Sequence, residues 1–312
     1  MSKIAFVFPG QGSQSVGMLN ALSEINSIIK NTFDEASEVL GYDLFALTQM
    51  GPELELNQTE KTQPALLAAS TAIYRLWVEK NGCSPDYMAG HSLGEYSALV
   101  CAGALNYKDA IKLVALRGQL MQKAVPEGAG AMSAIIGLSN EEIAKACEEA
   151  AQGEIVSPVN FNSPGQVVIA GDKAAVERAN ILCKEKGAKR ALPLPVSVPS
   201  HCLLMKPIAE EFKAALAGIS IQTPVIPVVN NVDVAIATES DVILDALTRQ
   251  LFNPVLWSQS MEFLANSGVT QLYELGPGKV LTGLAKRIDA RLEAFCINTP
   301  DTLETALQQL NA

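Results

Sequence analysis

Histidine is nearly absent from this sequence, which contains only His91 and His201, and its acidic residues form no cluster. A metal centre built from histidine and carboxylate ligands therefore finds no support. The six cysteines include no C-x-x-C pair, and their scatter fits free thiols better than a zinc site or a disulfide framework. Free thiols are typical of a reducing compartment, so we expect a cytoplasmic protein.

Long apolar runs are also missing. No stretch approaches the roughly 20 apolar residues that a membrane-spanning helix needs. Residues 3–10 hold one basic residue and an apolar run too short for a signal peptide. We therefore expect no association with a membrane, and we interpret this segment as the buried first strand of a parallel sheet.

Basic residues are fewer than acidic ones, with 23 Lys and Arg against 33 Asp and Glu, which gives a net charge of −10. Such a surface repels phosphate backbones, so we expect no binding to nucleic acid. The phosphate-binding glycine motifs are incomplete: Ser15 replaces the third glycine of G-x-G-x-x-G, and Val280 follows Lys279 where a phosphate loop needs Ser or Thr. We expect no bound cofactor.

What remains is a chain of 312 residues with 48% hydrophobic residues, enough for two domains or for one domain with a large insertion. Strand-like and helix-like segments alternate through the first 120 residues, which indicates βαβ units and a parallel sheet. Residues 301–310 are typical of a short closing helix. The sequence therefore predicts an α/β fold.

A second unit follows the composition break at residues 126–130. We expect its strands at residues 131–138, 155–161, 166–170 and 191–198, and its helices after Ser139 and at residues 174–186. The order β-α-β-β-α-β predicts a ferredoxin-like unit. We therefore predict a small domain of residues 126–198, inserted into a large α/β domain made of residues 1–125 and 199–312.

Residues 90–94 read Gly-His-Ser-Leu-Gly, between a short apolar run and a helix-like stretch. This strand–turn–helix context is what a G-x-S-x-G nucleophile elbow requires. It predicts Ser92 as a nucleophile and the backbone N–H of Leu93 as a donor to an oxyanion. The alternative is an ordinary turn serine.

A serine hydroxyl is a weak nucleophile until a base takes its proton, and imidazole suits this task at neutral pH. His91 adjoins Ser92, so we expect its ring to point away from the hydroxyl. His201 lies where the chain re-enters the large domain, which makes it the better base. The alternative is a buried core histidine. No carboxylate between Ser92 and His201 is an obvious third member of a triad, so a backbone carbonyl could orient the imidazole.

Arg117 projects from the middle of the apolar face of the helix predicted over residues 107–124. A buried guanidinium needs a carboxylate, which either the protein or a ligand supplies. If the ligand supplies it, the substrate carries a carboxylate beside its reacting carbonyl; the alternative is a structural salt bridge. The glycine-rich loop of residues 8–14 suits a second oxyanion donor, the N–H of Gln11, or is a plain turn.

Taken together, residues 8–14, residues 90–96, Arg117, residues 199–201 and residues 274–278 resemble the malonyl-CoA:acyl carrier protein transacylases of bacterial fatty-acid synthesis, nearly end to end and in family order. The resemblance implies an α/β-hydrolase-like large domain with a ferredoxin-like insert. It also implies the site residues: Ser92 as nucleophile, His201 as base, Gln250 with its carbonyl on His201, Gln11 and Leu93 as the oxyanion hole, Arg117 on the malonyl carboxylate, and Gln63 and His91 at the substrate pocket.

The implied reaction is a ping-pong transfer of malonyl from malonyl-CoA to the phosphopantetheine thiol of acyl carrier protein, through a malonyl-serine ester. We expect a monomer that docks the carrier on one of two basic clusters, around Lys184–Arg190 or around Lys279–Arg291. Two rival readings stay open. One is a serine thioesterase or hydrolase that releases the acyl group to water, and the other is a non-catalytic module that binds acyl carriers.

Overall fold

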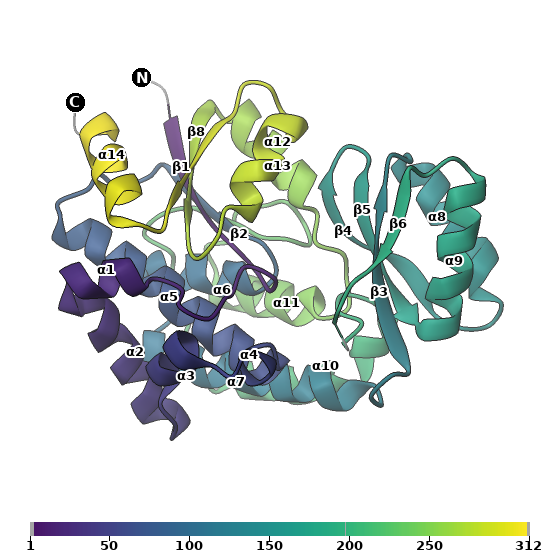
Figure 1. Cartoon of the computed structure of the whole chain (residues 1–312), viewed down its shortest axis with the longest axis horizontal. Coiled ribbons are helices and arrows are strands. Elements are labelled where there is room, and N and C mark those ends of the chain that lie inside the picture. Colours follow the sequence, from purple (N-terminus) through teal and green to yellow (C-terminus); the bar gives the residue numbers. More distant parts are fainter. Residues whose placement is uncertain (1–2, 197, 311–312) are drawn as a thin grey trace.

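The computed structural model describes residues 3–196 and 198–310, which form two sheets with helices packed against them (Figure 1). The larger sheet is parallel throughout. In spatial order its strands are β7 (Val228–Val229), β2 (Tyr87–Gly90), β1 (Lys3–Phe8), β8 (Val269–Leu275) and β9 (Glu293–Ile297). Because the strands run in one direction, the loops after their carboxyl ends meet at a single edge of the sheet.

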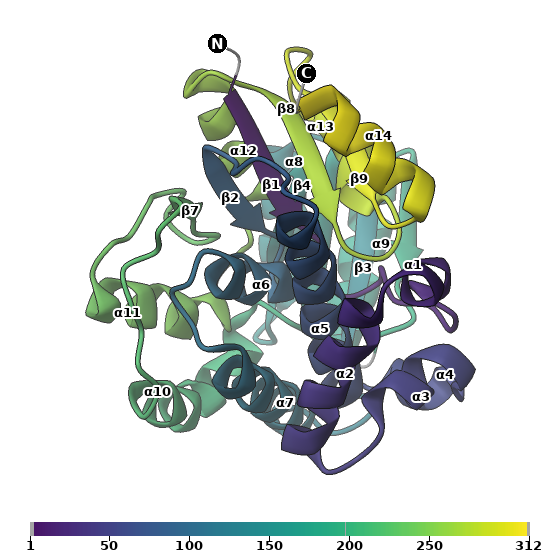
Figure 2. The same cartoon turned by 90° about the vertical axis from the view of Figure 1, so that its left-hand side faces the viewer.

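Strand β1 is the central strand, as its apolar sequence predicts, and helices cover both of its faces (Figure 2). On one face Phe6 and Phe8 pack in the main core with α2 (Ser27–Leu40), α5 (Thr59–Glu79), α6 (Leu93–Cys101) and α7 (Tyr107–Ala124). On the other face Ala5 and Val7 pack with α12 (Trp257–Asn266) and α13 (Val280–Ile288). The predicted helix over residues 107–124 is confirmed.

The predicted βαβ arrangement is present in the first 120 residues, where β1 and β2 are parallel and separated by helices, but strands are fewer than a regular alternation would give. Helices alone join β1 to β2, and they are α1 (Asn20–Ile25), α2, α3 (Leu44–Met50), α4 (Glu53–Leu56) and α5. Most residues of α5 are buried, so its sequence lacks the polar face that marks a surface helix. A buried helix and a buried strand then share the same apolar pattern.

The smaller sheet is antiparallel, in the order β4 (Val156–Ser163), β5 (Gln166–Asp172), β3 (Gly130–Ile136) and β6 (Arg190–Pro193). Its helices α8 (Asn140–Ala151) and α9 (Lys173–Glu185) lie on the side away from the parallel sheet (Figure 1). Ser139 caps α8 as expected. The last strand is shorter than predicted because Pro193 and Pro195 lack the N–H that would continue the ladder; residue 197 lies outside the described residues.

Backbone hydrogen bonds join the smaller sheet to the loop before α12. The Val255 N–H donates to the carbonyl of Val159 at 2.8 Å, and the Phe161 N–H donates to the carbonyl of Val255 at 3.0 Å. This bridge extends the edge strand β4 toward the loop before α12. The remaining helices are a 3-10 helix (Leu203–Ile208), α10 (Ala209–Ala217), α11 (Ser240–Gln250) and the closing helix α14 (Pro300–Leu310). Within the described ranges, no helix is long and apolar enough to cross a membrane.

Candidate active site

Ser92 occupies the sharp turn between β2 and α6, with φ 53° and ψ −109°. Non-glycine residues rarely adopt this backbone conformation, and it is the strain expected of a nucleophile elbow. Glycine is required on both sides of Ser92 because other backbone atoms approach these two positions closely. A Cβ on Gly90 would collide with the backbone of Gly94, and a Cβ on Gly94 would collide with the carbonyl of Phe8. The sequence therefore folds into this turn only with glycine on both sides of the serine.

Asn231, in the loop after β7, holds the elbow in place. Its Oδ1 accepts a hydrogen bond from the Ser92 N–H at 2.7 Å, and its Nδ2 donates to the carbonyl of Gly90 at 2.7 Å. Sequence reasoning missed this residue because it lies far from Ser92 along the chain. Its signal was an Asn-Asn pair directly after a short buried strand, at the sheet edge where Ser92 also lies.

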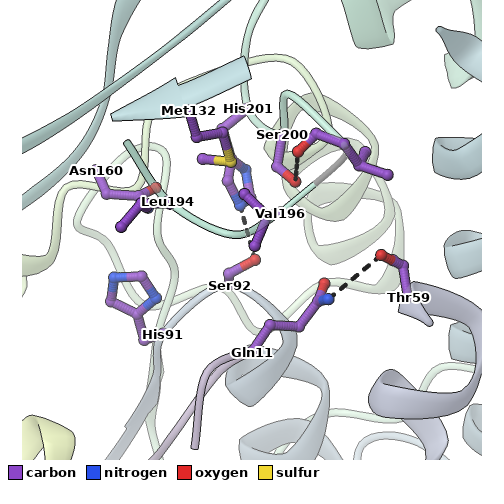
Figure 3. A pocket seen from close by; sticks show the side chains of 11 residues that line it. Gln11, Thr59, His91, Ser92, Met132, Asn160, Leu194, Val196, Ser200 and His201 are labelled. Carbon is purple, nitrogen blue, oxygen red and sulfur yellow. Dashed lines mark hydrogen bonds between the residues drawn. The ribbon is translucent and has the colours of Figure 1, made fainter. Parts of the chain in front are cut away.

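His201 contacts the serine hydroxyl. Its Nε2 lies 2.7 Å from Ser92 Oγ (Figure 3). Its Nδ1 lies 2.7 Å from the carbonyl oxygen of Gln250. A carbonyl only accepts, so Nδ1 carries the proton and Nε2 of the neutral ring can accept one. Burial, together with the nearby Arg117, lowers the pKa of His201 to about 3. A neutral imidazole on a serine hydroxyl can act as a general base.

Arg117 lies beneath Ser92 and is fully buried. Its two terminal nitrogens donate to the side-chain oxygens of Gln63 and Gln250, at 2.9 and 3.0 Å. One of them also lies 3.4 Å from Ser92 Oγ. In the described part of the chain no carboxylate forms an ion pair with Arg117, so the alternative of a structural salt bridge is wrong. The guanidinium is held by neutral amides and keeps its positive charge directed toward the serine.

Glu95 is a second buried charged group, one turn after Ser92 on α6. Its Oε2 accepts from Gln250 Nε2 at 2.8 Å and from the Asn231 N–H at 3.0 Å. Burial raises the pKa of Glu95 to about 7. Sequence reasoning did not single it out, although a charge inside an otherwise apolar helix was a usable signal.

The cavity above Ser92 measures about 110 Å³ and lies between the loops after β1 and β2 on one side and strands β3 and β4 of the smaller sheet on the other (Figure 3). It is lined by Gln11, Thr59, His91, Ser92, Met132, Asn160, Leu194, Val196, Val198, Ser200 and His201. Gln63 lies behind Arg117 and does not line this cavity, contrary to its expected place in the pocket. Leu93 begins α6, so its N–H has no acceptor within the helix and can face a ligand.

His91 lines the cavity but does not point at the hydroxyl, as expected. Its Nε2 bonds Asn162 Oδ1 on β4 at 2.8 Å, and its ring packs on Trp257 with 5.5 Å between centroids. The Gln11 side chain lies 3.4 Å from Thr59 Oγ1 (Figure 3). Among the residues that the structure describes, no group of three His, Cys, Asp or Glu could hold a metal ion.

The two basic clusters lie on exposed surface, and intramolecular ion pairs already reduce their charge. Lys186 pairs with Glu149 at 2.9 Å, and Arg291 pairs with Asp289 at 2.6 Å. In the described chain, ion pairs are absent at the other basic residues of the clusters, which are Lys184, Lys189, Arg190, Lys279, Lys286 and Arg287. These side chains remain available to an acidic partner.

A serine bonded to a neutral imidazole, in a cavity between two sheets, is typical of enzymes that act on acyl groups through a serine. Residues 5–287 match the family model described as the acyl transferase domain. The chain is 63% identical to the malonyl CoA-acyl carrier protein transacylase of Escherichia coli (strain K12), over 99% of this chain and 100% of that relative. It therefore belongs to the malonyl CoA-acyl carrier protein transacylases within the acyl transferase family.

Solved structures agree with this assignment. An acyl carrier protein S-malonyltransferase from Vibrio cholerae superposes with a TM-score of 0.96 at 64% identity, covering 97% of this chain and 99% of the other. A malonyl-transacylase in complex with a type II PKS acyl-carrier protein superposes with a TM-score of 0.98 at 63% identity, covering 99% and 100%. The similarity spans both sheets, so it includes all the elements that form the site.

Proposed function

We propose that this chain transfers the malonyl group of malonyl-CoA to the phosphopantetheine thiol of an acyl carrier protein, through a malonyl ester on Ser92. Support comes from the full-length relative in Escherichia coli and from the similar malonyl-transacylase solved with its carrier protein. The geometry of the site supports each step.

In the first half-reaction Ser92 Oγ attacks the thioester carbonyl carbon while His201 Nε2 accepts the hydroxyl proton, a transfer that the 2.7 Å contact favours. The backbone N–H groups of Gln11 and Leu93 stabilise the tetrahedral oxyanion. The carbon–sulfur bond then breaks, His201 returns the proton to the departing sulfur, and coenzyme A leaves. The product is malonyl-Ser92.

The second half-reaction reverses these roles. The phosphopantetheine thiol gives its proton to His201 and attacks the ester carbonyl, and the carbon–oxygen bond to Ser92 breaks. His201 then returns the proton to Ser92 Oγ. The carbonyl of Gln250 keeps Nδ1 protonated throughout, so Nε2 remains the atom that exchanges the proton.

The observation that supports malonyl as the substrate is the set of hydrogen-bond partners of Arg117. Among the described residues, this buried guanidinium hydrogen-bonds to amide oxygens and the serine hydroxyl and lies over the ring of Tyr96, so an incoming carboxylate would be its first anionic partner in direct contact. Malonyl carries such a carboxylate next to its reacting carbonyl. Gln63 serves as a support for Arg117, while His91 contributes to the wall of the substrate pocket.

The proposal also assigns the chain to two domains. We assign residues 1–125 and 199–312 to an α/β-hydrolase-like catalytic domain, and residues 126–198 to a ferredoxin-like small domain. The element order β3-α8-β4-β5-α9-β6 and the strand order β4-β5-β3-β6 support the second assignment. We further propose a cytoplasmic monomer that needs no resident cofactor.

The decisive experiment follows radiolabelled malonyl after mixing with labelled malonyl-CoA, with and without holo acyl carrier protein. The expected result is a stable labelled protein alone and quantitative transfer of label to the carrier when it is added. Release of free malonate at an undiminished rate without carrier would instead identify a hydrolase. Failure to label the protein at all would leave only a binding module.

A further inference from the structure

Glu95 and Arg117 are opposite charges buried in the same small space, yet they do not contact each other. Both are at most 2% exposed, and the amide of Gln250 lies between them. Its Nε2 donates to Glu95 Oε2 at 2.8 Å, while its Oε1 accepts from Arg117 at 3.0 Å. The backbone carbonyl of the same residue accepts from His201.

This arrangement allows the Gln250 amide only one orientation. An ionised carboxylate only accepts hydrogen bonds, and a guanidinium only donates them. If the amide were reversed, its NH₂ group would face Arg117 and its oxygen would face Glu95, so both hydrogen bonds would be lost. Two acceptors therefore select the orientation that presents an oxygen to Arg117. They are the carboxylate of Glu95 and the backbone carbonyl of Ser92, which accepts from the same Gln250 Nε2 at 3.1 Å.

We propose that Glu95 is a positioning residue, which acts through the side chain of Gln250 to aim Arg117 at the carboxylate of the acyl donor. This inference rests on the proposed malonyl transfer and adds a residue to it.

The charge balance explains why the carboxylate is kept one residue away. In its ionised form Glu95 offsets the buried positive charge of Arg117, which would otherwise be costly, and this attraction keeps the pKa of Glu95 below the value that burial alone would give. A carboxylate in direct contact with Arg117 would compete with the carboxylate of the substrate for the same donors. With Gln250 between them, the positive charge of Arg117 is balanced by Glu95, and Arg117 can still bind an anion. Its contact of 3.4 Å with Ser92 Oγ marks the direction from which that anion comes.

The test compares two acyl donors on the Glu95→Gln variant, malonyl-CoA and the uncharged acetyl-CoA. Both donors use Ser92 and His201, but only malonyl-CoA offers a carboxylate to Arg117. We expect kcat/KM for malonyl-CoA to fall about tenfold, chiefly through KM, as for the loss of one charge-assisted hydrogen bond. The value for acetyl-CoA should stay within about twofold. An equal fall for both donors would show a merely structural role and overturn the proposal.

Glu274 provides the matched control. It is also fully buried, and its carboxylate caps α13 by accepting the N–H groups of Leu281 and Thr282 at 3.1 and 2.7 Å. Glu274→Gln should lower the melting temperature and leave the ratio of malonyl to acetyl unchanged. A comparable change of that ratio in Glu274→Gln would also overturn the proposal.

Gln250→Met keeps the backbone carbonyl on His201 but removes the amide, so it tests the same connection if Glu95→Gln fails to fold. We expect the same loss of malonyl selectivity, and no further loss in the double variant, because the two side chains act as one unit. Losses that multiply in the double variant would show independent roles and overturn the proposal. A wild-type protein with no preference for malonyl would refute the proposed function itself, whereas a preference that survives Glu95→Gln refutes only this inference.

Discussion

At the scale of single residues, the chemistry depends on a histidine that stays neutral. Burial lowers the pKa of both histidines, and for His201 the value falls from 6.5 to about 3. Since protonation needs a pH below the pKa, the ring of His201 is uncharged across the neutral range and Nε2 can accept a proton.

Imidazole chemical shifts of the free protein test this directly, because the chain has only two histidines. We expect neither ring to titrate with a midpoint near 6.5, the unshifted value. We also expect His201 to show the tautomer with the proton on Nδ1, since that atom faces the Gln250 carbonyl. A midpoint near the ordinary histidine pKa for His201 would contradict this description of the site.

Arg117 is the residue that we hold responsible for acyl selectivity. Arg117→Ala removes a buried, hydrogen-bonded charge, and truncating such a group typically costs about 2–5 kcal/mol of binding. We therefore expect kcat/KM for malonyl-CoA to fall roughly a hundredfold, with a much smaller effect on acetyl-CoA. Steady-state kinetics with both donors checks this; unchanged activity on malonyl-CoA would refute the role.

At the scale of elements, the turn from β2 to α6 could be predicted because its determinants are local. Gly90, Ser92 and Gly94 lie within five residues, between a strand and a helix. Asn231 and Glu95 each carried a local sequence signal, but their roles could not be predicted because those roles depend on contacts across 139 and 155 positions of the chain. The orienting carbonyl of Gln250 came only from family resemblance, since any backbone carbonyl could serve and no side-chain pattern marks it.

The elbow itself can be tested at Asn231. Asn231→Ala leaves the buried N–H of Ser92 and the carbonyl of Gly90 without their partners, and each loss costs about 1–3 kcal/mol. We expect a lower melting temperature and slower acylation of Ser92. Asn230→Ala is the control, because in the described chain Asn230 Oδ1 accepts from the Asp233 N–H at 2.7 Å and from no group of the Ser92 turn. The Asn230→Ala variant should lower stability alone. If it slowed acylation of Ser92 as much as Asn231→Ala does, the role of Asn231 would be refuted.

At the scale of the whole molecule, the α/β fold class was predictable from the order of elements, whereas the position of the antiparallel sheet against the parallel sheet was not. The cavity exists because β3 and β4 of the antiparallel sheet face the carboxyl ends of the parallel strands. Local sequence does not encode that docking. It depends on contacts such as the bridge at Val255 and the hydrogen bond from His91 to Asn162.

The net charge of the molecule affects how it can bind the carrier protein. A net charge of −10 would repel an acidic partner, so docking needs a local basic surface. We propose two charge-reversal variants, one at Lys184, Lys189 and Arg190 and the other at Lys279 and Lys286. One of the two should raise the KM for carrier protein, more strongly at low salt. Malonyl-Ser92 formation should be unaffected. An intact KM with both clusters reversed would place docking elsewhere.

The most direct test of the central claim locates the malonyl group on the chain. Peptide mass spectrometry after brief exposure to malonyl-CoA should find the modification on Ser92 alone, and His201→Ala should slow its appearance by at least about a hundredfold. Malonyl on another residue, or acylation of Ser92 at the wild-type rate without His201, would contradict the account.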